Sequence, residues 1–192
     1  QVISDKQATY VDLFICETMS SIKEAKASII AATAHSIETW CALTISDQKT
    51  SSLRSNEGIE EALIQLQEFD YSANLLNCSI PESITVSLNY LKNFNKPFGA
   101  YANGFTSIDA LEIGGTVDVL ASRNDLGPDA YLQYVIGWLA SGATIVGGCC
   151  EISPDHIKLI YDTLEKLTSA EQHEIKKLED LMQEQDNLKS NY

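Results

Sequence analysis

The sequence has no apolar run that approaches the ~20 residues a membrane-spanning helix needs. Its first residues, QVISDKQATY, are polar and show no secretory signal. Basic side chains are also scarce: 13 Lys and Arg stand against 27 Asp and Glu, and the formal charge is -14. A surface this acidic repels phosphate backbones and anionic lipid headgroups. We therefore expect neither nucleic acid nor a membrane surface as a partner.

The cysteines are few and their number is odd. The five cysteines include no CxxC pair, and most stand in apolar segments. Disulfide frameworks use paired cysteines, so this pattern favours a cytoplasmic protein whose thiols are free or bound to a metal. Hydrophobic residues make up 44% of the chain and charged residues 21%, the balance of a globular protein, and 192 residues suffice for one domain with a sizeable core.

Apolar runs alternate with amphipathic stretches as far as residue 167. The runs are short and rich in β-prone side chains, which predicts buried strands. The stretches have apolar residues at helical spacing and often begin with serine or proline, which predicts helices. The predicted strands are 10–18, 39–46, 73–80, 97–105 and 143–150, and the predicted helices are 19–34, 59–69, 81–93, 128–141 and 154–167. Residues 106–127 are expected to be mostly loop, and 168–192 a polar helical tail.

Five strand-then-helix units in a row predict an α/β fold with a parallel sheet and right-handed crossovers. A barrel and a doubly wound sheet both fit this pattern. No GxGxxG follows the first strand, which argues against the dinucleotide-binding version. In either architecture the catalytic and binding residues are expected at the C-terminal ends of the strands. Those ends read CET, TIS, NCS, ANGF and GGCC here.

Three cysteines stand at such strand ends. Cys78 ends one predicted strand, and Cys149 and Cys150 end another. Three thiols at one face could bind zinc and leave its fourth position open for a substrate. Neighbouring residues on a regular strand point to opposite faces, so the backbone must leave strand geometry here, which Gly147 and Gly148 would permit.

The same residues admit other interpretations. A free cysteine is commonly a small buried hydrophobe, which is the interpretation adopted for Cys16 and Cys41. A disulfide between Cys149 and Cys150 would be strained. In a barrel enzyme of another kind, the glycines before them could approach a phosphate. The spacing of the cysteines does not decide among these hypotheses.

Four local strings carry a family resemblance. They are GATIVGGCCEISPDHI at 142–157, ANLLNCSIPESI at 73–84, DLFICETMSSIKEA at 12–25 and PFGAYANGF at 97–105. The first two resemble the zinc-ligand segments of the zinc-dependent homocysteine S-methyltransferase family. The third is similar to the fourth strand and helix of that family's barrel, and the last to its seventh strand. The likeness covers about residues 10–167.

The resemblance implies a (β/α)8 TIM barrel, of which residues 1–167 would form the C-terminal five units. It implies zinc at the barrel mouth, held by Cys78, Cys149 and Cys150. Glu17 matches the family's strand-four glutamate, which contacts the amino group of homocysteine, and is the expected catalytic and substrate-binding residue. Asn77 and Asn103 match polar positions around the site and are expected to bind substrate.

The implied reaction is the transfer of a methyl group from a sulfonium or other activated donor to the zinc-bound thiolate of homocysteine, giving methionine. The sequence does not name the donor, although the lack of an obvious folate or cobalamin module favours a small sulfonium. Trp40, Tyr101 and Phe105 could line a site for a cationic donor or simply belong to the core.

One departure from the family is large. Three strand–helix units precede the segment that matches residue 10 in the family, and five units cannot close an eight-stranded barrel. Two sheet edges would remain open, so we expect activity to need those units, supplied by another chain or a homo-oligomer. The alternative is a zinc-binding, non-catalytic subunit or fragment that pairs with a partner chain.

Several other polar residues are expected to have ordinary roles. Asp118, Arg123 and Asp125 fall in the predicted loop and could contact substrate, but they are interpreted as exposed charges. His156, in the first turn of the last predicted helix, is interpreted as a surface or packing residue rather than a metal ligand.

Overall fold

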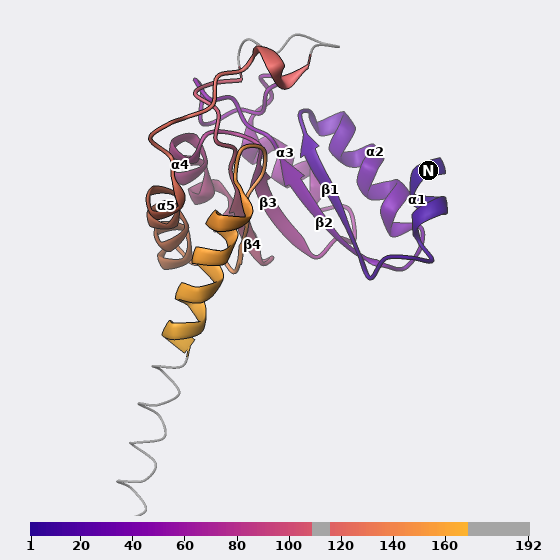
Figure 1. The fold of residues 1–192 in the computed structure, drawn as a ribbon. Helices are drawn as coiled ribbons and strands as arrows, with labels where there is room; N and C mark the ends of the chain where they lie inside the picture. Colours follow the sequence, from indigo (N-terminus) through magenta and orange to yellow (C-terminus); the bar gives the residue numbers. More distant parts are fainter. Residues whose placement is uncertain (109–115, 169–192) are drawn as a thin grey trace, which may run out of the picture.

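The structure, a computed structural model, describes residues 1–108 and 116–168 and is built around one parallel sheet (Figure 1). The sheet has five strands in sequential order, and every neighbouring pair is parallel. The strands are β1 (Leu13–Met19), β2 (Glu38–Leu43), β3 (Ala73–Asn77), β4 (Phe98–Tyr101) and β5 (Ile145–Val146). The predicted parallel sheet of strand–helix units is confirmed.

Most strands end earlier than predicted. The last four end between three and four residues before their predicted C-terminal limits, while β1 runs one residue beyond its limit. The predicted limits included apolar and small residues that continue each run past the regular strand. In the structure these residues form the loops at the C-terminal edge of the sheet, where the cysteines lie.

The helices follow the strands as predicted, with one addition at the N-terminus. They are α1 (Val2–Gln7), α2 (Ile22–Thr33), α3 (Ile59–Leu66), α4 (Pro81–Leu91), α5 (Pro128–Ala140) and the 3-10 helix η1 (Val117–Val119), and a last helix begins at residue 154 and is described through 168. The sequence did not predict α1, because Val2 and Ile3 are exposed and only Ser4 is buried, which leaves no amphipathic pattern. The rest of the predicted tail, 169–192, lies outside the described residues.

The predicted start and stop signals act as expected. The Ser21 hydroxyl caps α2 by accepting from the Glu24 amide at 3.2 Å, while the Glu24 carboxylate accepts from the Ser20 amide at 3.0 Å. Both α4 and α5 begin with a proline, whose missing amide proton costs nothing there. Gly142, just after α5, adopts a φ of +100°, which only glycine takes without strain.

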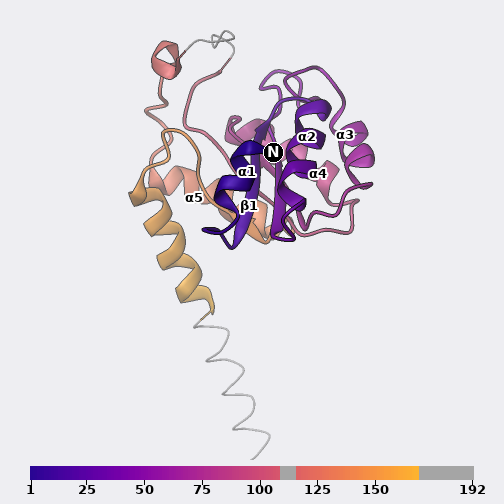
Figure 2. The same ribbon diagram turned by 90° about the vertical axis from the view of Figure 1, so that its right-hand side faces the viewer.

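The sequential strand order decides between the two architectures that the sequence left open. A doubly wound sheet reverses its strand order, whereas right-handed crossovers in an unreversed order place every helix on one face. Figure 2 shows α2, α3 and α4 gathered on one side of β1, with the last helix standing apart from them. The core forms between helices and sheet from apolar side chains such as Ala25, Ile29, Leu43, Leu63, Leu76, Ile84, Leu88 and Trp138.

Two sheet edges carry no further strand in the described part of the chain. The strand β1 pairs only with β2, and β5 only with β4. On β1, the side chain of Ile15 is 44% exposed although it belongs to an otherwise apolar run. None of the described helices combines the length and apolar character needed to cross a membrane.

Gly99 lets β5 approach β4. A Cβ atom at Gly99 would lie 1.9 Å from the carbonyl oxygen of Ile145, the residue it pairs with. Because that obstacle is backbone, a side chain there must push the two strands apart. Gly137, on the exposed surface of α5, has nothing within 4 Å of the same position.

We expect Gly99→Ala to lower the free energy of unfolding by about 1–3 kcal/mol, the usual cost of overpacking. Gly137→Ala is the matched control and should raise it by roughly 0.5–1 kcal/mol, since alanine favours the helix. Urea denaturation followed by circular dichroism measures both. Equal stability of Gly99→Ala and the unaltered chain would contradict the close approach.

Candidate metal centre

The structure brings the three predicted zinc-ligand cysteines together at the C-terminal edge of the sheet. Cys78 directly follows β3, and Cys149 and Cys150 follow β5. Their sulfur atoms all lie within 4.8 Å of one another, and the Cys149 and Cys150 sulfurs are 3.8 Å apart. All five cysteines are free thiols, so this last distance joins no disulfide.

A register shift explains how two neighbouring cysteines face one point. The parallel ladder between β4 and β5 continues past both strands, with Cys149 N donating to Ala102 O at 2.9 Å. The next regular bond would run from Gly104 N to Cys149 O, but Gly104 N donates to Cys150 O instead, at 2.9 Å. One extra residue is therefore inserted on this side, as in a β-bulge, and the strict alternation of side chains is broken.

Tyr131 supports the same region from α5. Its buried hydroxyl accepts from Ala102 N at 3.0 Å and donates to Gly147 O at 2.8 Å. In an unbroken parallel ladder those two backbone groups would bond directly to each other. The tyrosine thus opens the ladder just before the cysteines and satisfies both groups that the opening would leave unpaired.

Cys78 adopts an unusual backbone conformation. Its φ is 51°, in the left-handed region that few non-glycine residues enter. This turns the chain sharply at the end of β3 and sets the sulfur toward the other two thiols. Such strain persists only where neighbouring contacts fix the conformation.

The cysteine cluster already favours a thiolate. A hydrogen bond from Cys149 lowers the pKa of Cys78 from 9.0 to about 6, assisted by Arg54 and by the Asn103 amide against the opposing effect of burial. The same shared hydrogen bond raises the pKa of Cys149, as does its burial. Metals bind thiolates, so this arrangement suits a metal ligand.

Cys16 and Cys41 behave differently and confirm their interpretation as core residues. Both side chains are buried, and burial raises the pKa of Cys16 to about 11 and that of Cys41 further.

Arg54 is a member of this site that no sequence motif indicated. It lies on the loop between β2 and α3, and its guanidinium donates to the carbonyl oxygen of Cys78. Among the described residues its buried Nε has no hydrogen-bond partner. The side chain places a positive charge beside the cysteine cluster, where it stabilises negative sulfur.

The two predicted asparagines occupy different places. Asn103 is fully buried; its oxygen accepts from Phe105 N at 3.1 Å, and its amide lowers the pKa of Cys78. Asn77 is also buried, and both its polar atoms bond Thr18: its oxygen accepts from Thr18 N at 3.0 Å, and its amide donates to the Thr18 hydroxyl at 2.9 Å. Asn77 therefore joins the end of β3 to the end of β1, next to Glu17.

Glu17 lies at the same edge of the sheet, on β1, with an exposed side chain. The Tyr101 hydroxyl reaches it from β4 and donates to its Oε2 at 3.3 Å. Of the other aromatics considered, Phe105 is buried, and Trp40 donates its indole N–H to Glu38 at the start of β2, the end of that strand away from the cysteines.

His156 is a packing residue, as interpreted from the sequence. It is buried against Tyr131, with its Nε2 3.0 Å from Leu126 O and its Nδ1 2.8 Å from the Ser153 hydroxyl. Within residues 1–108 and 116–168, one group of three or more His, Cys, Asp or Glu side chains is close enough to share a metal ion. It consists of Cys78, Cys149 and Cys150, and His156 does not belong to it.

The donor set fits zinc. Sulfurs bound at ~2.3 Å to a tetrahedral zinc lie roughly 3.8 Å apart, and the sulfurs of Cys149 and Cys150 are 3.8 Å apart. Cys150 is exposed and the other two are partly exposed, so the cluster faces the outside of the molecule. Three protein ligands and an accessible fourth position are typical of a catalytic rather than a structural zinc site.

Comparison with known proteins connects this chain to one family. The family model described as homocysteine S-methyltransferase matches residues 3–164. The selenocysteine methyltransferase of Astragalus bisulcatus is 29% identical over 168 residues, which cover 85% of this chain and 47% of that protein. Homocysteine S-methyltransferase 2 of Zea mays is 30% identical over 98 residues, which cover 50% of this chain and 27% of that protein. The chain therefore spans at most about half the length of these curated relatives.

Solved structures support the fold. The homocysteine methyltransferase MmuM from Escherichia coli superposes in its apo form with a TM-score of 0.64 at 21% identity, covering 83% of this chain and 53% of that one. Its metallated form superposes with a TM-score of 0.63 at 22% identity, covering 82% of this chain and 47% of that one. The predicted fold class, five strand–helix units of a TIM barrel, is confirmed.

We expect Tyr131→Phe to lower the free energy of unfolding, because Ala102 N and Gly147 O lose their shared partner inside the protein. Each buried unpaired group costs about 1–3 kcal/mol. The control is Tyr161→Phe, which removes a hydroxyl from an exposed tyrosine of the last helix and should change stability by less than about 0.5 kcal/mol. Similar urea midpoints for the two variants would mean that the ladder closes without the hydroxyl.

Proposed function

Since the chain belongs to the homocysteine S-methyltransferase family, we propose that it holds one zinc ion through Cys78, Cys149 and Cys150 and serves methyl transfer to homocysteine. The observation that carries the proposal is the meeting of three thiols from two distant segments, within 4.8 Å of one another and open to the outside. Zinc, when bound, would favour the thiolate form of a fourth, incoming thiol.

The chain's own residues would bind and orient the acceptor. The Glu17 carboxylate would accept hydrogen bonds from the amino group of homocysteine, and the Tyr101 hydroxyl already donates to one of its oxygens. Asn77 supports Glu17 through Thr18. Asn103 and Arg54 stabilise negative charge on the Cys78 sulfur. Positive charge beside the cluster matters because three thiolates and one zinc ion sum to minus one.

The reaction exchanges one bond for another. The bond between the methyl carbon and the donor sulfur breaks, and its electron pair stays on that sulfur. A new bond forms between the methyl carbon and the homocysteine sulfur, which has already given up its proton. The products are methionine and an uncharged thioether, so a sulfonium donor loses its positive charge. An electron-rich site suits such a cationic donor.

Catalysis on this proposal needs more strand–helix units than the described residues supply. The outer edge of β1 is unpaired and borders a hollow lined by residues of α1, β1 and α2, including Phe14, Cys16 and Glu17. We propose that three further units pair with β1 and β5, supplied by another polypeptide, a second copy or additional sequence. The alternative is a zinc-binding subunit without turnover, since the three cysteines of the cluster all lie within the described residues. The free thiols suit the cytoplasm.

We expect the purified chain to bind about one zinc ion, and Cys78→Ala to bind none under the same conditions, because two sulfurs hold zinc weakly. Cys41→Ala is the matched control: it removes a buried thiol away from the cluster and should leave the stoichiometry unchanged. Atomic absorption after dialysis gives the zinc content. Retention of zinc by Cys78→Ala would overturn the assignment of the ligands.

We expect methionine formation from homocysteine and S-methylmethionine when the chain is supplied with a complementary segment of three strand–helix units from a family member. Glu17→Gln should then raise KM for homocysteine about 10- to 100-fold, since a hydrogen bond to a charged group contributes ~1.5–3 kcal/mol. Glu38→Gln, at the opposite end of the neighbouring strand, should not. Zinc binding without any methionine formation by the assembled protein would favour the non-catalytic alternative.

A further inference from the structure

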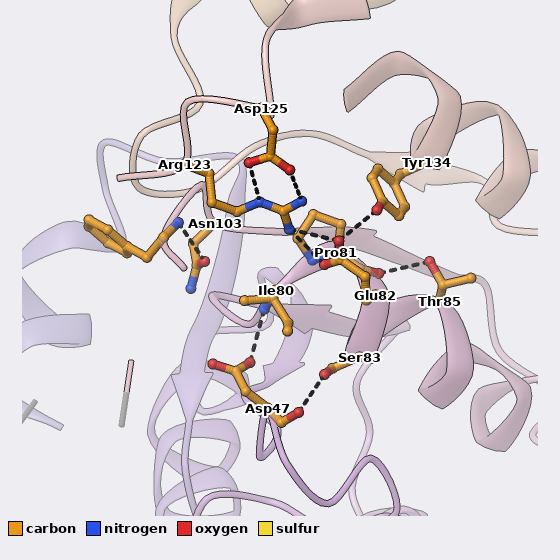
Figure 3. Close-up of polar contacts among 11 residues, drawn as sticks. Asp47, Ile80, Pro81, Glu82, Ser83, Thr85, Asn103, Arg123, Asp125 and Tyr134 are labelled. Carbon is orange, nitrogen blue, oxygen red and sulfur yellow. Dashed lines mark hydrogen bonds and ion pairs between the residues drawn. The ribbon is translucent and has the colours of Figure 1, made fainter. Parts of the chain in front are cut away.

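One loop contacts both segments that carry the cysteines. Residues 116–127 are the part of the β4–α5 connection that leads into α5, and two consecutive side chains in this loop, Ser122 and Arg123, bond to Glu151 and Glu82. Figure 3 shows Arg123 between Asp125 and Glu82, with Tyr134 of α5 also reaching Glu82. The sequence interpretation of Arg123 as an exposed loop charge is therefore wrong, because its side chain is only 14% exposed.

The first contact is with the Cys78 segment. The Arg123 Nη1 donates to both carboxylate oxygens of Glu82, at 2.7 and 2.8 Å. Glu82 lies in the first turn of α4, four residues after Cys78, and also accepts from the Tyr134 hydroxyl at 2.7 Å. Asp125 fixes the other side of the guanidinium with bonds of 3.1 and 2.7 Å. Paired, directional bonds of this kind set geometry as well as charge.

The second contact is with the Cys149–Cys150 segment. The Ser122 hydroxyl donates to the Glu151 carboxylate at 2.8 Å, next to Cys150. The backbone N–H of Arg123 donates to Gly104 O at 2.8 Å, and Gly104 N in turn donates to Cys150 O at 2.9 Å. A short chain of bonds thus runs from the Cys78 segment through Arg123 to Cys150.

The opposite side of the Cys78 segment is held separately. Asp47, from the loop after β2, accepts from Ile80 N at 3.0 Å, and its carbonyl accepts from the Ser83 hydroxyl at 3.0 Å (Figure 3). The left-handed turn at Cys78 is therefore held on one side by Asp47 and on the other by Arg123. Backbone bonds through residues 101–104 also join it to the second cysteine segment, because Cys78 N donates to Tyr101 O and Cys149 N donates to Ala102 O. The Arg123 side adds a side-chain link to this backbone connection.

We propose that Arg123 is a positioning residue that fixes the spacing between the Cys78 segment and the Cys149–Cys150 segment. Its bond to Glu82 locates the first segment, and its loop locates the second. The inference rests on the proposed zinc centre, because the spacing matters for three sulfurs that must share one ion. Residues that orient metal ligands without touching the metal commonly change metal affinity about 10- to 100-fold when they are replaced.

The test measures the dissociation constant for zinc with a competing chelator, using the full chain. Arg123→Met and Glu82→Gln should each raise this constant about 10-fold or more. The double variant should be little worse than either single variant, because both remove the same contact. In cobalt-loaded protein, the visible bands of tetrahedral thiolate coordination should weaken. Lys158→Met is the control, since it removes an exposed ion pair with Asp162 on the last helix and should change neither measurement.

Circular dichroism and thermal melts identify variants that remain folded, and Arg123→Lys replaces Arg123→Met if the latter does not fold. A folded variant with the zinc affinity and cobalt spectrum of the unaltered chain overturns the positioning role while leaving the zinc centre intact. Failure of the unaltered chain to bind zinc overturns the centre and the positioning role together. These two failures are thus distinguished by the unaltered chain alone.

Discussion

The site depends on one constraint: three sulfurs from segments about seventy residues apart must lie within 4.8 Å of one another. Regular strands cannot meet it, because neighbouring side chains alternate between faces. The structure departs from regularity on both sides of the cluster. Cys78 takes a left-handed backbone, and the ladder beside β5 gains an extra residue where Gly104 bonds Cys150 rather than Cys149. Each departure has a partner for its freed carbonyl: Arg54 donates to Cys78 O, and Ile152 N donates to Cys149 O at 3.1 Å. Tyr131 satisfies the opening of the ladder that precedes the cysteines.

Much of the fold was predictable because it follows from local patterns. Buried runs, helical spacing and prolines at helix starts located five strands and their helices, and the strand-end rule brought the cysteines to one edge. The strand limits were less predictable, since small and apolar residues such as those of GGCC continue beyond the regular strand. The supporting residues Arg54, Tyr131 and Arg123 could not be identified from spacing, because each acts across the sheet on residues distant in sequence. Arg123 in particular has the sequence context of an exposed charge and the surroundings of a buried one.

The electrostatics of the site explain why a positive side chain lies beside it in so acidic a protein. Three thiols at this spacing cannot all ionise without a cation, so they share protons when no metal is bound. The pKa of Cys78 is therefore lowered, while that of Cys149 is raised. Arg54 and the Asn103 amide favour negative sulfur without neutralising the cluster fully. Such a balance leaves the sulfurs ready for a divalent ion while limiting the repulsion that the protein's formal charge of -14 would add.

The proposed metal binding and the proposed methyl transfer depend on different parts of the chain. The cysteines and the residues that support them, Asp47, Arg54, Arg123 and Tyr131, lie between positions 47 and 150, and their contacts are made within the described residues. Glu17, by contrast, is exposed on β1, whose outer edge is unpaired, and it is held there through Tyr101. Whatever pairs with that edge will complete the surroundings of the Glu17 carboxylate. All the contacts of the proposed metal centre are therefore made within these segments, whereas the proposed binding of an amino-acid acceptor depends on how the edge of β1 is completed.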